Sequence, residues 1–154
     1  MVTKMKKILI ILFVLISVLI WYGEKRSFYC LSVGKCVTVW KTYGNTCYII
    51  PYNYYGLFKP SGNYMITTNT NDLAIYWTEQ LGDSIVVRCD KNYEIKNNNE
   101  KKTLLIDYNG NKDKFHEIFY KPNAKKFNDI KNNIKLIEIS IKENYATDKN
   151  GNKL

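Results

Sequence analysis

Short runs of alternating apolar and polar residues fill the first half of the chain beyond residue 26. They are rich in β-branched and aromatic side chains, and the turn-forming segments SVGK, TYGN, NTND and EQLGD separate them. Strands that recur every 8 to 12 residues are typical of small sandwiches and barrels. The predicted strands span residues 27–31, 35–40, 46–50, 63–68, 73–78 and 83–89.

The second half combines two periodicities. TLLIDY (103–108) and IKLIEISIK (134–142) read as further strands, with isoleucines alternating against polar residues in the latter. Between them, Phe115, Ile118 and Phe119 are spaced as one helical face. Asn111 or Asp113 can cap that helix and Pro122 can end it, whereas Phe127, Ile130 and Ile134 suggest a second short helix. The pattern predicts a mainly β domain, a small antiparallel sandwich or a barrel-like form, with one or two short C-terminal helices.

The apolar run at residues 8–22 follows Lys4, Lys6 and Lys7 and precedes Lys25 and Arg26. This arrangement is typical of an export signal, yet no small-residue cleavage site follows it. As a helix it would extend about 22 Å, less than the roughly 30 Å of a bilayer core, and the flanking lysines can reach the interfaces. We expect a transmembrane signal-anchor helix over 8–22, or alternatively a cleaved signal that leaves a secreted or periplasmic protein.

The positive charges before the apolar run favour a cytoplasmic N-terminus at residues 1–7. Residues 23–154 would then form one extracytoplasmic domain. Within it, the sequence suggests a Cys- and Tyr-rich part (27–90), a polar loop (91–102), a basic α+β part (103–143) and a polar tail (144–154). The basic surplus is scattered and carries no nucleic-acid-binding motif, so we do not expect a nucleic-acid partner.

All four cysteines, Cys30, Cys36, Cys47 and Cys89, lie in the first half, and an even number beyond an export signal predicts disulfides. If SVGK is a four-residue turn, Cys30 and Cys36 point to opposite faces, which disfavours a bridge between them. The other pairings stay open. The spacing lacks paired C-x-x-C motifs and the chain has one histidine, so we expect no zinc and no other cofactor.

The segment DYNGNKD (107–113) places oxygen-bearing side chains at alternate positions, as calcium loops do: Asp107, Asn109, Asn111 and Asp113. However, Gly110 stands fourth instead of sixth, and the twelfth position is an isoleucine where EF-hands use a bidentate glutamate. Because Asn-Gly is a strong turn signal, a tight turn is the favoured interpretation.

Catalytic chemistry has little support in the sequence. His116 is the only histidine, and no nucleophile motif accompanies it. Glu79 and Asp83 are a carboxylate pair of the type that glycosidases use, but they flank a predicted turn. We therefore expect a protein that is not an enzyme, and an envelope hydrolase based on these groups is the less favoured alternative.

The stretch CYIIPYNYYGLFKP (47–60) is unusually dense in aromatic residues. If it were extended, Tyr52, Tyr54 and Phe58 would face one side, and Tyr55 and Leu57 the other. Exposed tyrosines offer a large contact area at low entropic cost and suit binding of a protein or a sugar ring. The alternative is that Pro51 and Gly56 break the strand and the rings fold into the core.

SGNY (61–64) followed by IYWTEQLGDSIVV (75–87) resembles the loop and Trp-containing strand of the small membrane-attached inhibitors of C-type lysozyme. The resemblance covers less than a fifth of the chain, and Glu79 stands near where that family has a lysine. It implies a disulfide-bearing β-barrel in which Ser61 and Tyr64 contact the cleft of an enzyme.

The sequence thus leads to a membrane-anchored extracytoplasmic domain that binds an envelope protein or a glycan through Tyr52, Tyr54, Tyr55 and Phe58. An inhibitor or immunity protein against an envelope-targeting enzyme such as a lysozyme is the alternative. The sequence leaves the partner and the oligomeric state open.

Overall fold

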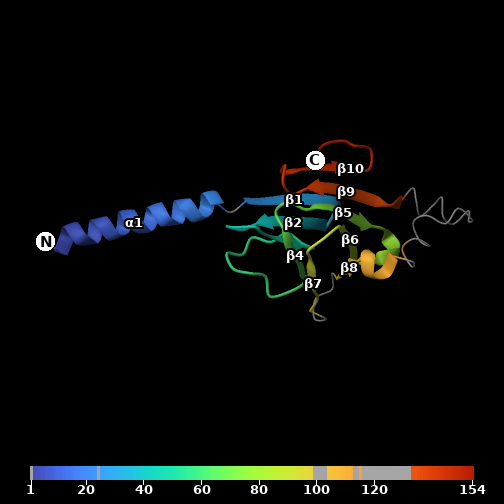
Figure 1. The fold of residues 1–154 in the computed structure, drawn as a ribbon, viewed down its shortest axis with the longest axis horizontal. Helices are drawn as coiled ribbons and strands as arrows, with labels where there is room; N and C mark the ends of the chain where they lie inside the picture. Colours follow the sequence, from blue (N-terminus) through green and yellow to red (C-terminus); the bar gives the residue numbers. More distant parts are fainter. Residues whose placement is uncertain (1, 24, 99–103, 113–114, 116–132) are drawn as a thin grey trace, which may run out of the picture.

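The computed structural model describes residues 2–23, 25–98, 104–112, 115 and 133–154. These residues form a long N-terminal helix followed by two five-stranded sheets (Figure 1). Sheet A has the strand order β1-β2-β3-β4-β7, and sheet B the order β10-β9-β5-β6-β8. The mainly β prediction is confirmed. The described strands stay in two separate sheets, so the sandwich form of the prediction holds and the closed form does not.

Sheet A is wholly antiparallel. Its strands are β1 (Lys25–Ser32), β2 (Lys35–Lys41), β3 (Thr46–Ile50), β4 (Tyr64–Thr68) and β7 (Glu94–Lys96). The first four follow one another as a meander, with short turns from β1 to β2 and from β2 to β3. A thirteen-residue connection, residues 51–63, links β3 to β4.

Sheet B is mixed, because β8 pairs with β6 in parallel while the other neighbours are antiparallel. Its strands are β5 (Asp72–Trp77), β6 (Ile85–Cys89), β8 (Leu105–Asp107), β9 (Lys135–Ser140) and β10 (Tyr145–Asp148). Two 3-10 turns, η1 (Glu79–Leu81) and η2 (Asn109–Asn111), join or follow its strands. β9 lies between β5 and β10 and supplies the isoleucine row that the sequence pattern predicts.

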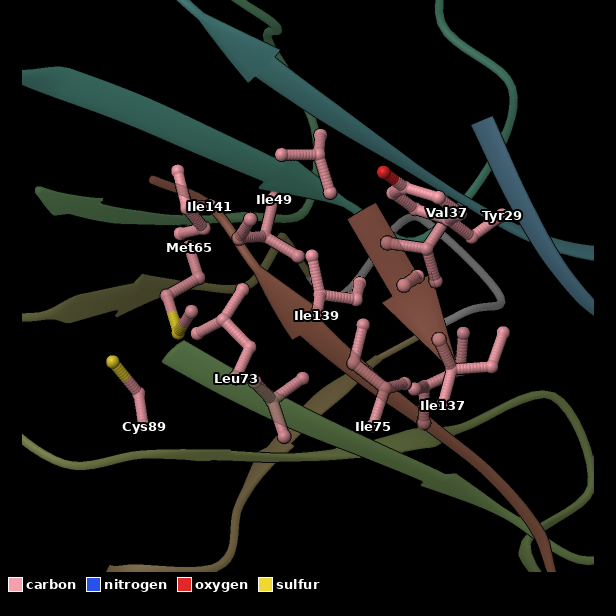
Figure 2. Packing of buried hydrophobic residues seen from close by; sticks show 14 of the residues in the cluster. Tyr29, Val37, Ile49, Met65, Leu73, Ile75, Cys89, Ile137, Ile139 and Ile141 are labelled. Carbon is pink, nitrogen blue, oxygen red and sulfur yellow. The ribbon is translucent and has the colours of Figure 1, made fainter. Parts of the chain in front are cut away.

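The core lies between the two sheets and is built from alternate residues of both. In sheet A the inward positions include Val37, Ile49 and Met65, and in sheet B they include Ile75 and Ile139. Figure 2 shows these side chains meeting across the gap between the strands. Because the side-chain period of a strand is two, this inward row leaves a second row on the outer face of each sheet.

A disulfide joins Cys30 to Cys36 on the outer side of the β1–β2 hairpin. The prediction that these two cysteines point to opposite faces is wrong. Only Val33 and Gly34 lie between the strands, and the register shifts by one residue between Cys30 and Ser32. This bulge places Cys30 directly opposite Cys36, because a one-residue shift exchanges the two faces of a strand.

Helix α1 (Val2–Gly23) contains the apolar run, and β1 begins two residues after the helix ends. From Met5 to Val18 its apolar side chains are exposed around the whole helix. In the described part of the chain, no helix combines the length and the apolar character needed to cross a membrane. The predicted transmembrane span over 8–22 is therefore not found: as a helix, the apolar stretch is about 22 Å long, whereas a bilayer core is about 30 Å thick.

The remaining secondary-structure predictions concern the second half of the chain. The predicted helices near 111–122 and 127–134 fall largely outside the described residues. The short strand β7 lies inside the segment expected as a loop (91–102), and β10 lies inside the expected polar tail (144–154). Both strands are at sheet edges and carry charged or polar residues, as edge strands commonly do, so they show little hydrophobic alternation.

Candidate functional site

The connection from β3 to β4 lies against the outer face of sheet A, and Figure 1 shows it as the green loop below β2 that reaches toward the end of the domain where α1 joins. We call residues 51–63 the aromatic loop. Beneath it, neighbouring strands align Arg26 with Trp40, Trp40 with Tyr48, and Tyr48 with Ile66. This row supplies an apolar floor on which the loop packs.

Thr38 fastens the start of the aromatic loop to the sheet. It is completely buried on the outer face of β2. Its hydroxyl donates to the carbonyl of Tyr52 at 2.7 Å and accepts from the backbone N–H of Tyr54 at 2.9 Å. Pro51 has no N–H to donate to a neighbouring strand, and β3 ends just before it. Beyond that point, the Thr38 hydroxyl of β2 satisfies backbone groups of Tyr52 and Tyr54.

Tyr54 braces the loop from within. Its hydroxyl donates to the carbonyl of Phe58, and its ring packs 5.9 Å from Trp40 and 6.2 Å from Tyr52 between centroids. Gly56 lies directly against this ring, where a Cβ would overlap the Tyr54 hydroxyl and ring. A larger residue at position 56 would therefore displace the Tyr54 ring, and since the φ of Gly56 is not positive, this close approach is what favours glycine there.

Trp40 is the centre of the aromatic cluster under the loop and is 3 % exposed. The Arg26 guanidinium lies 4.2 Å from the centroid of its ring and 5.8 Å from that of Tyr54, a cation–π arrangement. Among the described residues, no acceptor lies within hydrogen-bonding distance of the buried Trp40 Nε1–H. A buried indole N–H normally has a partner, so this donor carries a desolvation cost.

The outer side of the loop is left open to solvent. Tyr55, Leu57 and Phe58 are 72 %, 81 % and 82 % exposed. The Tyr55 ring packs against the exposed ring of Phe28 on β1, tilted by 30° at 5.0 Å between centroids, so the apolar surface continues onto the sheet. We call Phe28, Tyr55, Leu57 and Phe58 the aromatic patch. Tyr52 and Tyr54, the other two residues of the predicted binding surface, are half-buried and lie beneath the patch.

Basic groups border the aromatic patch. Lys59 lies 5.4 Å above the ring of Tyr64, and its hydrogen bond to the Tyr64 hydroxyl raises the pKa of the ammonium group. Burial raises the pKa of Tyr52, and the nearby Tyr54 adds to that shift. Both shifts favour the protonated forms of Lys59 and Tyr52.

The two residues implied by the inhibitor resemblance lie in different environments. Ser61 is exposed at the end of the loop, whereas Tyr64 is 6 % exposed and belongs to the cluster beneath it. Tyr64 packs edge-on against Tyr48 at 5.7 Å between centroids. Only Ser61 of this pair presents its side chain to a partner in the described conformation.

The outer face of sheet B carries a hollow of a different kind from the aromatic patch. It is an open hollow of about 280 Å³ over Ala74, bordered by Asp72, Arg88, Asp90 and Glu138. Ala74 is the cross-strand neighbour of both Arg88 and Glu138, so the small side chain creates the hollow. Arg88 lies over the ring of Tyr108 at 5.9 Å, and its hydrogen bond with Tyr76 raises the pKa of the guanidinium further.

The residues considered for catalysis or metal binding are placed as follows. Asp83 forms an ion pair with Lys35 of β2, and exposed Glu79 begins the η1 turn. His116 and Asp113 lie outside the described residues. Asp107 accepts hydrogen bonds from the N–H groups of Asn109 and Gly110, which is the turn geometry that the sequence favours over a calcium loop. Within the described ranges, no three or more His, Cys, Asp or Glu side chains cluster to hold a metal ion.

Sequence reasoning missed three contributors to this surface: Thr38, Phe28 and Leu57. Thr38 and Phe28 are cross-strand neighbours on the outer face, and the alternation of β1 and β2 already assigns them to one row. An extended segment would place Leu57 on the face opposite Phe58. In the structure both are exposed, since residues 51–63 contain no strand.

Comparison with protein-family models, with curated proteins and with solved structures gives no match for this chain.

Proposed function

We propose that this chain is a non-enzymatic binding domain, held at a membrane on the extracytoplasmic side, that contacts a protein partner through the aromatic patch. The observation that carries the proposal is the exposure of Tyr55, Leu57 and Phe58 on a loop whose other side is firmly attached to the sheet. Large apolar side chains that gather on a surface and are rimmed by polar groups are characteristic of interaction sites.

The attachment of the loop favours binding over a purely structural role. Two hydrogen bonds to Thr38 and the Tyr54 brace fix the backbone before any partner arrives. A preordered loop loses less conformational entropy on association, and aromatic anchors contribute much of the energy of interfaces. The exposed side chains therefore have the properties of anchors for a pocket on another protein.

Charge indicates the kind of partner. Arg26 stands two residues before Phe28 on β1, and Lys59 directly follows Phe58, so two basic residues flank the aromatic patch. Sugar-binding sites commonly combine a ring platform with polar groups that pair with hydroxyls. A basic rim instead complements a protein surface whose apolar pocket is bordered by carboxylates. We therefore propose a protein with an acidic rim, in preference to a glycan.

Two observations support the location. The Cys30–Cys36 disulfide is of the kind that persists in oxidising compartments. The exposed apolar side chains of α1 favour contact with lipid, and residues 8–22 would attach the domain to the membrane. β1 begins two residues after α1, so the domain would be held close to that surface.

Hydroxyl-radical footprinting of the full chain tests the proposal. In native membranes, we expect the oxidation rates of Tyr55 and Phe58 to fall several-fold compared with the purified chain in detergent. Tyr43, which is 86 % exposed in the turn from β2 to β3, is the internal control and should keep its rate. If the oxidation rates of Tyr55, Phe58 and Tyr43 are each the same in native membranes as in detergent, the proposal is wrong.

The same footprinting on the purified chain in protein-free vesicles, of neutral or of anionic lipid, distinguishes a lipid partner from a protein partner. Protection that already appears there would assign the patch to lipid and refute a protein partner. A triple variant, Tyr55→Ser, Leu57→Ser and Phe58→Ser, should lose the membrane-dependent protection of Phe28. The control variant Val33→Ser/Tyr43→Ser removes exposed apolar side chains from two other turns and should keep it.

The hydrogen bonds that hold the loop also favour a more specific function: an inhibitor or immunity protein whose loop fills the cleft of an envelope-targeting enzyme. Preordered loops are common in tight inhibitors because little entropy is lost on binding. Purified chain added to a C-type lysozyme should then lower its rate of cell-wall hydrolysis, and Phe58→Ser should abolish the effect while Tyr43→Ser should not. An unchanged rate at excess chain would exclude this enzyme class as the target.

A further inference from the structure

Two cysteines remain in the core after the Cys30–Cys36 disulfide is assigned. Cys47 lies on β3 of sheet A and Cys89 at the end of β6 of sheet B, and both are thiols in this structure. They are essentially inaccessible, at 0 % and 1 % exposure, and belong to the same core cluster. One thiol therefore comes from each sheet, and both point into the space between the sheets.

The strand registers place the two thiols at the same level of the sandwich. Cys47 is the cross-strand neighbour of Thr67 on β4, and the Thr67 hydroxyl lies 3.5 Å from Cys89 Sγ. Figure 2 shows the sulfur of Cys89 directed away from its own strand and toward Met65, the next inward residue of β4. Thr67 thus touches one cysteine across the gap and pairs with the other within its sheet.

We infer that Cys47 and Cys89 form a second disulfide, which links sheet A to sheet B through the core. The inference is independent of the aromatic patch and shares with the proposed function only an oxidising compartment. Burial raises the pKa of the Cys47 thiol to about 12, with Lys41 opposing and Cys89 adding to the shift, so a thiolate at Cys47 is scarce once the core has closed. The bridge would therefore form while the chain folds.

The oxidant is a disulfide, either a small molecule such as glutathione disulfide or a disulfide carried by an oxidoreductase. The thiolate of Cys89 attacks one sulfur of this disulfide, which gives a mixed disulfide and releases one thiolate that takes up the proton lost by Cys89. Cys47 then loses its proton, attacks Cys89 Sγ and expels the second thiolate, which takes up that proton. Two cysteine thiols are oxidised and one disulfide is reduced to two thiols.

A direct test uses the full chain, reduced and unfolded with detergent present and then refolded in a buffer of reduced and oxidised glutathione. Remaining thiols are blocked with N-ethylmaleimide in denaturant, and the product is digested with trypsin without reduction. Lys59 precedes a proline, so Cys47 falls in peptide 42–88 and Cys89 in peptide 89–91. We expect these two peptides to be disulfide-linked, and peptides 27–35 and 36–41 to be linked through Cys30 and Cys36.

N-ethylmaleimide on both Cys47 and Cys89, or a link from either of them to Cys30 or Cys36, would overturn the inference. A second measurement uses the chain Cys30→Ser/Cys36→Ser, in which only the inferred bridge can form. Cys30 is exposed and Cys36 is half-exposed, so serine is tolerated at both positions. Dithiothreitol should lower its folded-to-unfolded ratio on the order of a thousandfold, because the bridge closes a long loop. In the matched chain Cys47→Ser/Cys89→Ser, dithiothreitol opens only the short Cys30–Cys36 loop and should have a smaller effect. If dithiothreitol does not move the denaturation midpoint of Cys30→Ser/Cys36→Ser, the inferred bridge is refuted.

Discussion

Both sheets carry large aromatic and aliphatic side chains on their outer faces, but the two faces are covered differently in the folded chain. Sheet A presents Trp40, Tyr48 and Ile50 on its outer face, and the chain's own aromatic loop folds back to cover them. Sheet B presents Tyr76 and Val86, which pack with Tyr108, just after β8, and with Phe115, while the area around Ala74 stays open as a charged hollow. The alternation in a strand sequence therefore predicts two faces, but it does not predict which segment, if any, covers the outer one.

The difference shows how this domain makes a contact surface. On sheet A, covering the floor uses one side of the loop, and the aromatic residues on its other side become exposed. On sheet B, the open area is bordered by carboxylates and one arginine, which water solvates well. The covered face is consequently the one that gains an apolar patch. Substitutions that act differently on the two faces test this comparison.

The largest expected effect is at the centre of the covered face. Trp40→Ala should lower the free energy of unfolding by about 3 to 5 kcal/mol, because it removes a buried indole and leaves a cavity under the loop. Trp40→Phe should cost clearly less, since it keeps an aromatic ring and removes a buried N–H that has no acceptor among the described residues. Urea denaturation of the full chain in detergent measures both. Equal losses for Ala and Phe would contradict this account of the covered face.

The next effect concerns the attachment of the loop. Thr38→Val keeps the shape of the side chain but removes the hydroxyl that bonds Tyr52 and Tyr54, which should cost about 1 to 3 kcal/mol. Amide hydrogen exchange should rise sharply at Tyr54 and remain slow at Val87 in sheet B. Thr38→Ser retains the hydroxyl and should preserve slow exchange at Tyr54. Fast exchange at Tyr54 in the unaltered chain would show that the loop is not held in this way.

A matched pair of enlargements compares the two faces directly. Gly56→Ala should cost about 1 kcal/mol, because its methyl group displaces the braced Tyr54 ring. Ala74→Val adds bulk in the open hollow of sheet B and should change the free energy of unfolding by less than about 0.5 kcal/mol. The denaturant midpoints of the two variants measure both changes. A larger loss at Ala74 than at Gly56 would reverse the assignment of open and covered faces.

The smallest expected effects come from the chain's two arginines, each of which lies over an aromatic ring. Arg26→Met should cost about 1 kcal/mol, since the guanidinium lies 4.2 Å from the Trp40 ring at the edge of the covered cluster. Arg88→Met should cost about 0.5 kcal/mol or less, because Arg88 is exposed and 5.9 Å from Tyr108. Lysine at each position should recover part of the loss, which separates charge from packing. Equal costs at the two sites would remove this contrast between the faces.

The sequence by itself determined the elements whose signal is local. Alternation of β-branched and aromatic residues located the strands of the first half and the isoleucine row of β9, because a strand that buries one face must alternate. It left open whether the aromatic segment is extended or is interrupted at Pro51 and Gly56, and it favoured a turn at Asn109–Gly110.

Only the tertiary structure decided which residues meet. The bulge in β1 brought Cys30 opposite Cys36, although a plausible turn length predicted the reverse, because a one-residue difference in register exchanges the faces of a strand. In the folded loop, Tyr52 and Tyr54 are half-buried while Tyr55 and Phe58 are exposed, because the first two pack on an aromatic cluster that β2, β3 and β4 supply together. Local composition carries no record of such distant partners, and packing between separate segments is what distinguishes a buried ring from an exposed one.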